Sequence, residues 1–364
     1  MGMFMTEKQG GSDVRTNTTF AVSDGDGYRL TGHKFFCSAP MCDAFLTLAY
    51  SDGGLSCFLV PRWIHTGERN NLNIQRLKDK LGNRSNASSE MEFFDTWGIM
   101  VGEEGRGIRT IIDMVQGNRY YCCFSSAALM RQGLVQALHH TAHRTAFQKK
   151  LIDQPLMKNV LADLAIEVEA ALALTLRVGR AMDEAESNES AAALARIGTA
   201  IGKYWVCKRA PGHIYEALEC HGGPGYIEDS IMPRLYREAP LNSIWEGAGN
   251  VMCLDVLRAL GREPAAIPAL LEELDAARGG HNLLDAAIDA LKMELADLEN
   301  LELRARGITE LMATALQGAL LVRHAPPEVA DAYCVSRLGQ RWTGAYGTLP
   351  TDMDFDTIIA RAAA

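Results

Sequence analysis

The sequence predicts an α+β protein, in which a small all-β domain precedes an all-helical region. Up to about residue 107, β-forming residues alternate with turn-forming residues, which is typical of short antiparallel strands. After Gly107, apolar residues recur at helical spacing in long segments rich in alanine and leucine. The chain has 364 residues, enough for about two domains. We therefore predict a β-domain at residues 1–107, a helical domain at 108–262 and an additional helical region at 263–364.

Turn residues mark the strands of the predicted β-domain. Gly25 and Gly27 lie between two alternating runs, 20–22 and 28–36, and this arrangement predicts a β-hairpin. Further strands are expected at residues 44–50, 55–60 and 90–94.

The helical part of the sequence divides into several long segments. We expect helices at residues 108–150, 155–186, 191–221 and 252–260. Gly261 follows the last of these, and a glycine there is a typical C-terminal stop. Residues 265–336 predict three or four more helical segments.

The composition indicates a globular protein of a reducing compartment. The chain is 48% hydrophobic, and no apolar run reaches the roughly 18 residues that a membrane-spanning helix needs. Its N-terminus has no basic segment followed by an apolar stretch, so no secretory signal is expected. Nine scattered cysteines without a CxxC motif predict free thiols and a cytoplasmic location. The net charge of −9 argues against nucleic acid as the main partner.

The sequence does not support several other kinds of site. His139, His140 and His143 have helical spacing, but no carboxylate or cysteine at a matching position completes a ligand set, so no metal is predicted. The chain lacks a GxGxxG after a strand and a GxxxxGKS/T, which argues against Rossmann and P-loop nucleotide binding. It also lacks the GxSxG elbow of serine hydrolases.

The first polar segment, Met5–Val14, carries adjacent glycines directly after an apolar start. Glycines such as Gly11 let the backbone approach a ligand closely. Thr6 and Ser12 offer hydroxyls that donate or accept hydrogen bonds. The residues alone allow two interpretations, a ligand-facing turn or an ordinary polar surface turn.

A second segment, Lys34–Pro40, ends a predicted strand in aromatic residues followed by a hydroxyl. Phe36 is suited to cover one face of a flat ring, and Ser38 is suited to reach the edge of such a ring. A buried strand end followed by a turn explains the same pattern.

A third segment, Asn242–Asn250, holds a glutamate between an indole and two glycines. Trp245 is suited to desolvate Glu246 and to raise its pKa toward neutrality, as a general base requires. The glycines free backbone N–H groups for an oxyanion or a phosphate. The alternative is a carboxylate that complements the dipole at a helix start.

In this order, the three segments resemble motifs of the acyl-CoA dehydrogenase family, and the Lys-Gln-Gly form of the first is similar to its AidB-like branch. The resemblance covers residues 3–260 and, for the AidB-like branch, extends to the C-terminus. It implies a small β-barrel or β-sandwich followed by a four-helix bundle with extra C-terminal helices. In the family a helical domain precedes the first segment, so the resemblance also implies that this chain lacks that domain.

The resemblance implies FAD as the cofactor. The Arg144–Gln148 segment resembles one whose arginine reaches the FAD pyrophosphate of a neighbouring subunit, and Glu219–Tyr226 resembles a loop that holds the dinucleotide across a dimer interface. Gln148 replaces the glycine of the family pattern, and Gln116 replaces an acid. The FAD contacts implied by the resemblance are Met5, Thr6, Gly11, Ser12, Phe36, Ser38, Arg144, Phe147, Glu219, Gly222, Gly223, Gly247 and Asn250.

The activity implied by the resemblance is oxidation of an acyl-CoA thioester to its α,β-unsaturated form. Glu246 is then the catalytic base that removes the α-proton, and its backbone N–H polarises the thioester carbonyl. Arg237 is expected to be structural and to pair with nearby acids. The expected partners are an electron-transferring flavoprotein and further copies of the chain in a homodimer or homotetramer. The implied substrate contacts are Ser12, Arg119, Trp245 and Gly247.

Two alternatives stay open. One is an AidB-like flavoprotein of the alkylation response that binds DNA, and the other is a FAD-binding protein without turnover. From Arg258 to the C-terminus the chain has ten basic and sixteen acidic residues, whereas phosphate binding needs clustered lysine and arginine. Arg337 and Arg341 are the residues from which a local positive face is expected if DNA binds.

Overall fold

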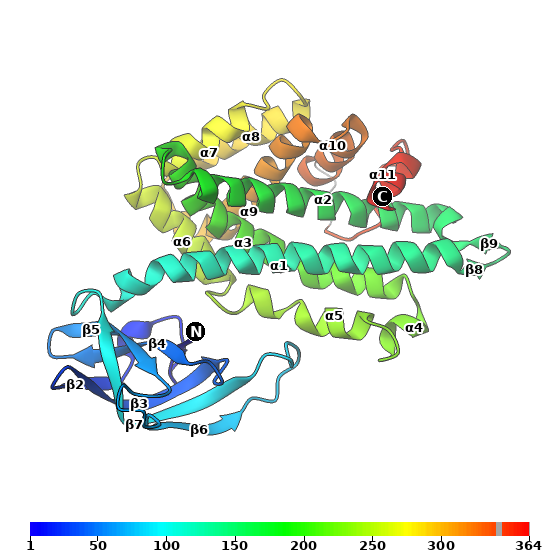
Figure 1. Cartoon of the computed structure of the whole chain (residues 1–364). Helices are drawn as coiled ribbons and strands as arrows, with labels where there is room; N and C mark the ends of the chain where they lie inside the picture. Colours follow the sequence, from blue (N-terminus) through cyan, green and yellow to red (C-terminus); the bar gives the residue numbers. More distant parts are fainter. Residues whose placement is uncertain (340–343, 364) are drawn as a thin grey trace. The chain divides into compact units, whose positions relative to one another are not determined.

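The computed structural model describes residues 1–339 and 344–363 and divides the chain into two compact units (Figure 1). Met1–Gly117 form a unit built mainly of strands, here called the sheet unit, and Asn118–Ala364 form the helical unit. The division falls inside helix α1 (Gly107–His143). The predicted order, a β-domain followed by helices, is confirmed, while the domain limits at 107 and 262 stay predictions.

Within the described residues of the sheet unit, seven strands form one sheet in the order β1-β3-β2-β4-β5-β7-β6. Pairings β1–β3, β3–β7, β7–β5, β5–β4 and β4–β1 close a ring, so these strands form a barrel. The strands are β1 (Gly2–Thr6), β2 (Phe20–Asp24), β3 (Gly27–Ser38), β4 (Ala44–Ser51), β5 (Gly54–Pro61), β6 (Leu72–Leu77) and β7 (Ser88–Val101).

The hairpin predicted around Gly25 is confirmed, because β2 pairs antiparallel with β3 and Asp24 faces Gly27. The strands predicted at 44–50, 55–60 and 90–94 are also present, although β7 begins slightly earlier than predicted and runs on to Val101. Strand β6 was not predicted. Its residues are mostly exposed, so they lack the apolar alternation that marks a half-buried strand.

Aromatic packing fills the interior of the barrel. Phe4 of β1 stacks on Phe45 of β4 with ring centroids 4.2 Å apart, and Phe93 of β7 lies 6.4 Å from the Phe4 ring. All three side chains are buried. These contacts join strands that are distant in sequence, which is how the barrel closes around one core.

A buried ion pair fixes the end of β1. Lys34 donates to Glu7 at 2.8 Å and to the Leu48 carbonyl at 2.7 Å, and its side chain is fully buried. Glu7 also accepts hydrogen bonds from the backbone and hydroxyl groups of Thr18 and Thr19. Burial alone would raise the pKa of Glu7, but Lys34 and these donors lower it to about 2. The segment after β1 is therefore anchored to β3 and β4.

The helical unit begins within α1, and most residues of α3 are buried in its core. Among the described residues, none of the helices is both long and apolar enough to cross a membrane. The other helices are α2 (Pro155–Glu184), α3 (Glu189–Glu219), α4 (Gly223–Tyr226), α5 (Met232–Glu238), α6 (Gly249–Arg262), α7 (Ala266–Asp275), α8 (Asn282–Ala296), α9 (Leu301–His324), α10 (Pro327–Tyr333) and α11 (Phe355–Ala363).

Most of the predicted helices are confirmed, with two corrections. The helix expected at 108–150 ends at His143, because a short hairpin of β8 (Thr145–Ala146) and β9 (Lys149–Lys150) follows it. Gly261 does not stop α6, which runs on to Arg262. The four helices α7 to α10 agree with the segments expected at 265–336, whereas α4, α5 and α11 were not predicted.

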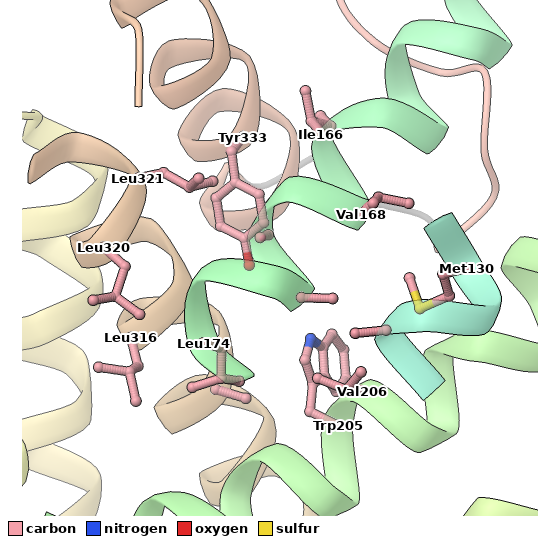
Figure 2. Close-up of a cluster of buried hydrophobic side chains, with 14 of the residues drawn as sticks. Met130, Ile166, Val168, Leu174, Trp205, Val206, Leu316, Leu320, Leu321 and Tyr333 are labelled. Carbon is pink, nitrogen blue, oxygen red and sulfur yellow. The ribbon is translucent and has the colours of Figure 1, made fainter. Parts of the chain in front are cut away.

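Figure 2 shows the buried cluster at the centre of the helical unit, with side chains from α1, α2, α3, α9 and α10. Trp205 and Tyr333 point their polar atoms toward each other, and both donate to the Gln317 side-chain oxygen, at 3.0 Å and 2.8 Å. A buried indole and phenol thus keep their hydrogen bonds inside an apolar core.

Two glycines let α1 pack closely on its neighbours. A Cβ at Gly179 of α2 would lie 2.3 Å from the Tyr120 hydroxyl oxygen, and one at Gly202 of α3 would lie 3.1 Å from the Cys123 sulfur. Tyr120 and Cys123 belong to α1. This close approach brings the middle of α1 beside α3, where the candidate site is built.

We predict that Lys34→Met lowers the free energy of unfolding at pH 7 by about 3–5 kcal/mol, because it leaves the buried Glu7 carboxylate without its cation. Lys8→Met is the matched control, since Lys8 is exposed, and it should change stability by less than about 0.5 kcal/mol. Urea unfolding measures both. In the wild type, Glu7 contributes stability fully above its ordinary pKa of 4.5, and this contribution is lost as the pH falls toward 2. Equal stabilities for the two variants would contradict the prediction.

Candidate active site

Glu246 lies in a strained loop between a 3-10 turn (Leu241–Ser243) and the first residue of α6, Gly249. Its backbone has φ = +57°, and the following Gly247 has φ = +107°. A left-handed conformation is natural for glycine but costs a glutamate about 1–2 kcal/mol. The surrounding structure must therefore hold Glu246 in place.

Residues from two helices hold this loop. Arg119 of α1 donates from Nε to the Glu246 carbonyl at 2.9 Å, and the Lys203 ammonium of α3 donates to the Gly247 carbonyl. Asn118, beside Arg119, donates a long hydrogen bond of 3.4 Å to the Glu246 carboxylate. The backbone is thus bound by two cations, while the carboxylate itself receives a weak hydrogen bond.

Asp255 of α6 anchors Arg119. Its side chain is 4% exposed and lies 3.0 Å from the Arg119 guanidinium. Arg196 of α3 makes two hydrogen bonds of 3.0 Å to the same carboxylate, and Arg258 approaches it at 3.3 Å from the solvent side. One carboxylate therefore connects α1, α3 and α6 directly behind the Glu246 loop.

Trp245 is held on the other side of the loop by a chain of hydrogen bonds. Its indole N–H donates to the Asn242 side-chain oxygen at 3.0 Å, and Asn242 donates to the Ser126 hydroxyl at 3.1 Å. Asn242 is buried, and Trp245 is half-buried beside Glu246. These hydrogen bonds fix the indole, and its predicted desolvation of the Glu246 carboxylate stays a prediction.

The electrostatic environment raises the pKa of Glu246. Burial is the main cause, and the hydrogen bond from Asn118 and the charges of Arg119 and Lys203 oppose it. Burial likewise lowers the pKa of Lys203. Burial raises the pKa of the Glu246 carboxylate, while Arg119 and Lys203 hold the neighbouring backbone rather than the carboxylate oxygens. These are the properties of a general base.

The contacts of three further predicted site residues can be described: those of Gly247, Asn250 and Arg119. A Cβ at Gly247 would lie 2.7 Å from the Met252 methyl group, and the φ of +107° at this position strains any residue with a side chain, so glycine is favoured there. The Asn250 side-chain oxygen accepts from Arg306 at 2.9 Å. The Arg119 guanidinium is occupied by Glu246 and Asp255, so the structure places it as a support of the loop, and its contact with substrate stays a prediction.

In the sheet unit, the first two sequence segments lie side by side. A bulge shifts the β1–β3 register between Phe4 and Thr6, so that Thr6 pairs with Phe36. Phe36 is 50% exposed, and it and Ser38 flank the buried Cys37, so both point away from the barrel core. A hydroxyl and a half-exposed aromatic ring therefore lie together on the outer face of the β1–β3 pair, with the Lys78 ammonium 4.6 Å from the centre of the Phe36 ring.

The adjacent turn packs against the same hydroxyl. A Cβ at Gly11 would lie 2.5 Å from the Thr6 hydroxyl oxygen, so any side chain there would displace it. The Met5 carbonyl accepts from Asn17 at 3.0 Å, and Ser12 is exposed. Of the predicted residues of the first segment, Gly11 therefore lies directly against the Thr6 hydroxyl.

The remaining predicted residues lie in the helical unit on exposed turns. Arg144 and Phe147 belong to the β8–β9 hairpin, and Phe147 is 96% exposed. Glu219, Gly222 and Gly223 are exposed at the end of α3 and the start of α4, and a Cβ at either glycine would meet no other atom within 4 Å. Open backbone of this kind is accessible to a phosphate or an adenine.

Sequence reasoning missed three residues that support Glu246: Asn118, Lys203 and Asp255. The two charged ones carry a signal, because each stands among apolar residues on a helix and is almost fully buried. Charged side chains rarely occupy such positions unless they are paired. The amide of Asn118 carries no comparable signal.

The structure also tests the predicted arginines outside the site. Arg237 makes two hydrogen bonds to Glu228, at 2.6 and 3.1 Å, so its predicted structural role is confirmed. Arg337 is buried against Asp163 and Glu167 of α2, which makes its expected place on a positive surface wrong. Arg341 lies outside the described residues.

Comparison with known proteins identifies related families and structures. The family model described as acyl-CoA dehydrogenase, middle domain, matches residues 2–96. The model described as acyl-CoA dehydrogenase, C-terminal domain, matches residues 105–261. Together the two matches cover most of the sheet unit and the helical unit as far as residue 261.

The putative acyl-CoA dehydrogenase AidB of Escherichia coli is 46% identical over 94% of this chain and 63% of that protein. Acyl-CoA dehydrogenase family member 11 of Caenorhabditis elegans is 31% identical over the same shares of the two chains. The crystal structure of C. elegans ACDH-11 in complex with C11-CoA superposes with a TM-score of 0.87 at 30% identity, over 95% of this chain and 66% of that one. The chain thus spans less than two thirds of the length of these relatives.

We predict that Asp255→Ala destabilises the helical unit by about 3–5 kcal/mol, because it leaves the buried Arg119 without a carboxylate partner. Arg196 would lose the same contact but would keep its ion pair with Glu263. Arg258→Ala removes an ion pair to the same carboxylate, but the Arg258 side chain is 58% exposed. Its cost should stay below about 1 kcal/mol. Urea unfolding compares the two variants, and similar losses would show that Asp255 is not the anchor.

We also predict that Gln148→Gly stabilises the hairpin by about 1 kcal/mol. Phe147 and Gln148 both have positive φ, +51° and +62°, which is the geometry of a type I′ turn that favours glycine. Lys149→Gly, one residue later on a strand, should instead destabilise it. Hydrogen exchange of the hairpin amides measures both changes in stability. The prediction requires that exchange becomes slower in Gln148→Gly and faster in Lys149→Gly.

Proposed function

This chain belongs to the acyl-CoA dehydrogenase family, and we propose that it is a FAD-dependent oxidoreductase that desaturates an acyl-CoA thioester between its α and β carbons. The observation that carries the proposal is the state of Glu246: a glutamate in a left-handed conformation, with a pKa raised by burial and a backbone bound by two cations. Such strain at a titratable residue is typical of functional sites.

The residues of both units are chemically suited to FAD. Thr6 and Ser38 offer hydroxyls, and the half-exposed Phe36 offers an aromatic ring, on the outer face of the paired strands β1 and β3. Gly11 leaves the space that the Thr6 hydroxyl needs. In the helical unit, Arg144 has the fork that binds phosphate, and Gly222 and Gly223 offer unobstructed backbone. FAD, when bound, supplies the acceptor for the β-hydrogen of the substrate as hydride.

The chain itself supplies the base. The Glu246 carboxylate accepts the α-proton, and the electron pair of the broken C–H bond becomes part of the new α,β double bond as the β-hydrogen leaves. The Glu246 backbone N–H is suited to polarise the thioester carbonyl, which acidifies the α-carbon. Trp245 is suited to limit the access of water to the carboxylate. Arg119 and Lys203 hold the backbone carbonyls of Glu246 and Gly247. The product is an α,β-unsaturated thioester.

The substrate class and partners follow from the same reasoning. An acyl-CoA is supported by the relative solved in complex with C11-CoA. We propose that an electron-transferring flavoprotein removes the electrons and that the chain forms a homodimer or homotetramer. The exposed hairpin with Phe147 is an accessible element for such contacts. The nine cysteines, all among the described residues, are free, which supports a cytoplasmic location.

We predict that Glu246→Gln retains yellow flavin but slows flavin bleaching by butyryl-CoA or isovaleryl-CoA by about 10²- to 10⁴-fold, because the base is removed while its shape is kept. Absorbance of the purified protein before and after addition of thioester measures this. Glu302→Gln, an exposed acid at the start of α9, is the control and should bleach like the wild type. Undiminished bleaching by Glu246→Gln would exclude this residue as the base.

The proposal also sets a pH dependence. Glu246 accepts a proton only when ionised, and burial raises its pKa above the ordinary 4.5. The bleaching rate of the wild type should therefore fall as the pH decreases through this raised pKa, at a higher pH than for an ordinary glutamate. A rate that is constant down to pH 4.5 would contradict the raised pKa.

A further inference from the structure

Lys203 is a buried lysine that points its ammonium group at the loop carrying Glu246. It lies in the middle of α3, is 1% exposed, and is followed by the buried residues Tyr204, Trp205 and Val206. Its ammonium donates to the Gly247 carbonyl. Burial of a lysine in apolar surroundings is costly unless it satisfies a particular partner. The partner here is the backbone next to the proposed base.

Lys203 and Arg119 bind two successive carbonyls of the same loop, those of Gly247 and Glu246. In a planar trans peptide the N–H points opposite to the C=O. Holding the two carbonyls therefore also fixes the directions of the Gly247 and Ala248 N–H groups. Both Glu246 and Gly247 have positive φ, and the two cations explain how this strained backbone persists.

We propose that Lys203 is a positioning residue for Glu246: its ammonium holds the Gly247 carbonyl so that Glu246 keeps its left-handed conformation, and its positive charge stabilises the carboxylate. The proposal rests on the role of Glu246 as the base. Lys203 belongs to α3 and lies outside the three sequence segments, so the proposal gives α3 a part in the reaction.

The charges around the carboxylate are consistent with this role. Arg119 and Cys122 face the region from α1, and Lys203 and Cys207 face it from α3. Burial raises the pKa of both thiols to about 12, so they are neutral at physiological pH. Lys203 and Arg119 then act together as positive charges that oppose the effect of burial on Glu246.

A purely structural role makes a different prediction. If Lys203 only satisfies a carbonyl, its replacement changes stability but leaves the titration of Glu246 where it is. Lys203→Met is the informative variant, because methionine has a similar length without the charge. Lys203→Arg retains the charge, and Lys203→Gln is a second neutral variant for the case that Lys203→Met does not fold. Lys292→Met removes an exposed lysine of α8 and is the matched control.

The experiment is an infrared pH titration of the purified protein without thioester, in which the Glu246 band is the one missing from Glu246→Gln. The expected result is an increase of about one unit in the pKa of Glu246 in Lys203→Met and Lys203→Gln. Lys203→Arg and Lys292→Met should titrate like the wild type. An unchanged Glu246 pKa in both neutral variants would overturn the proposal.

Bleaching by butyryl-CoA provides the second measurement. The neutral variants should bleach about tenfold more slowly than the wild type at a pH below their raised Glu246 pKa, and they should approach the wild-type rate as the pH increases. A loss that is equal at every pH would assign Lys203 a structural role and would overturn the electrostatic part. Because the infrared titration needs no turnover, a wild type that does not bleach would contradict the proposed function while leaving the test of Lys203 intact.

Discussion

The ion pair between Arg119 and Asp255 is the interaction on which the candidate site depends. These residues are 136 positions apart, yet their 3.0 Å contact joins α1 to α6 directly behind the Glu246 loop. Arg196 adds α3 to the same carboxylate. Arg119 also binds the Glu246 carbonyl, so the contacts among the three helices fix the position of that peptide group. The position of the proposed base is therefore a property of the whole helical unit.

Much of the fold could be predicted from the sequence, because the spacing of apolar residues and the residues that favour turns are local features of the chain. The Gly25–Gly27 hairpin and the long helices α2 and α3 follow from such patterns. The end of α1 does not, since the residues after His143 have no breaker, and the turn at Phe147 and Gln148 adopts positive φ without a glycine. Strand β6 is held by its pairing with β7 and not by its own apolar pattern.

The candidate site likewise contains some residues that the sequence predicts and others that only the structure reveals. Glu246 was predicted because the segment that it shares with Trp245 and Gly247 resembles the catalytic segment of the acyl-CoA dehydrogenase family, whereas the residues alone also allowed a carboxylate at a helix start. The supports Arg119, Lys203 and Asp255 reach it only through tertiary packing. A charged residue on an apolar helix indicates that a buried partner exists, but the sequence does not say which one. The partners had to be found in the structure.

Glu7, which is buried, and Glu246, which is partly buried, show how contact geometry separates a structural acid from a proposed base. Glu7 and Glu246 are both desolvated, and each has a buried lysine nearby. Lys34 binds the Glu7 carboxylate directly, threonine donors satisfy its other oxygen, and its pKa falls to about 2. Lys203 binds the backbone beside Glu246 instead, and Asn118 makes only a long contact with the carboxylate, so burial prevails and the pKa rises. A cation that bound the Glu246 oxygens as closely as Lys34 binds Glu7 would make it too weak a base to remove a proton from carbon. Placing the cations on the carbonyls fixes the position of the carboxylate and leaves its oxygens reactive.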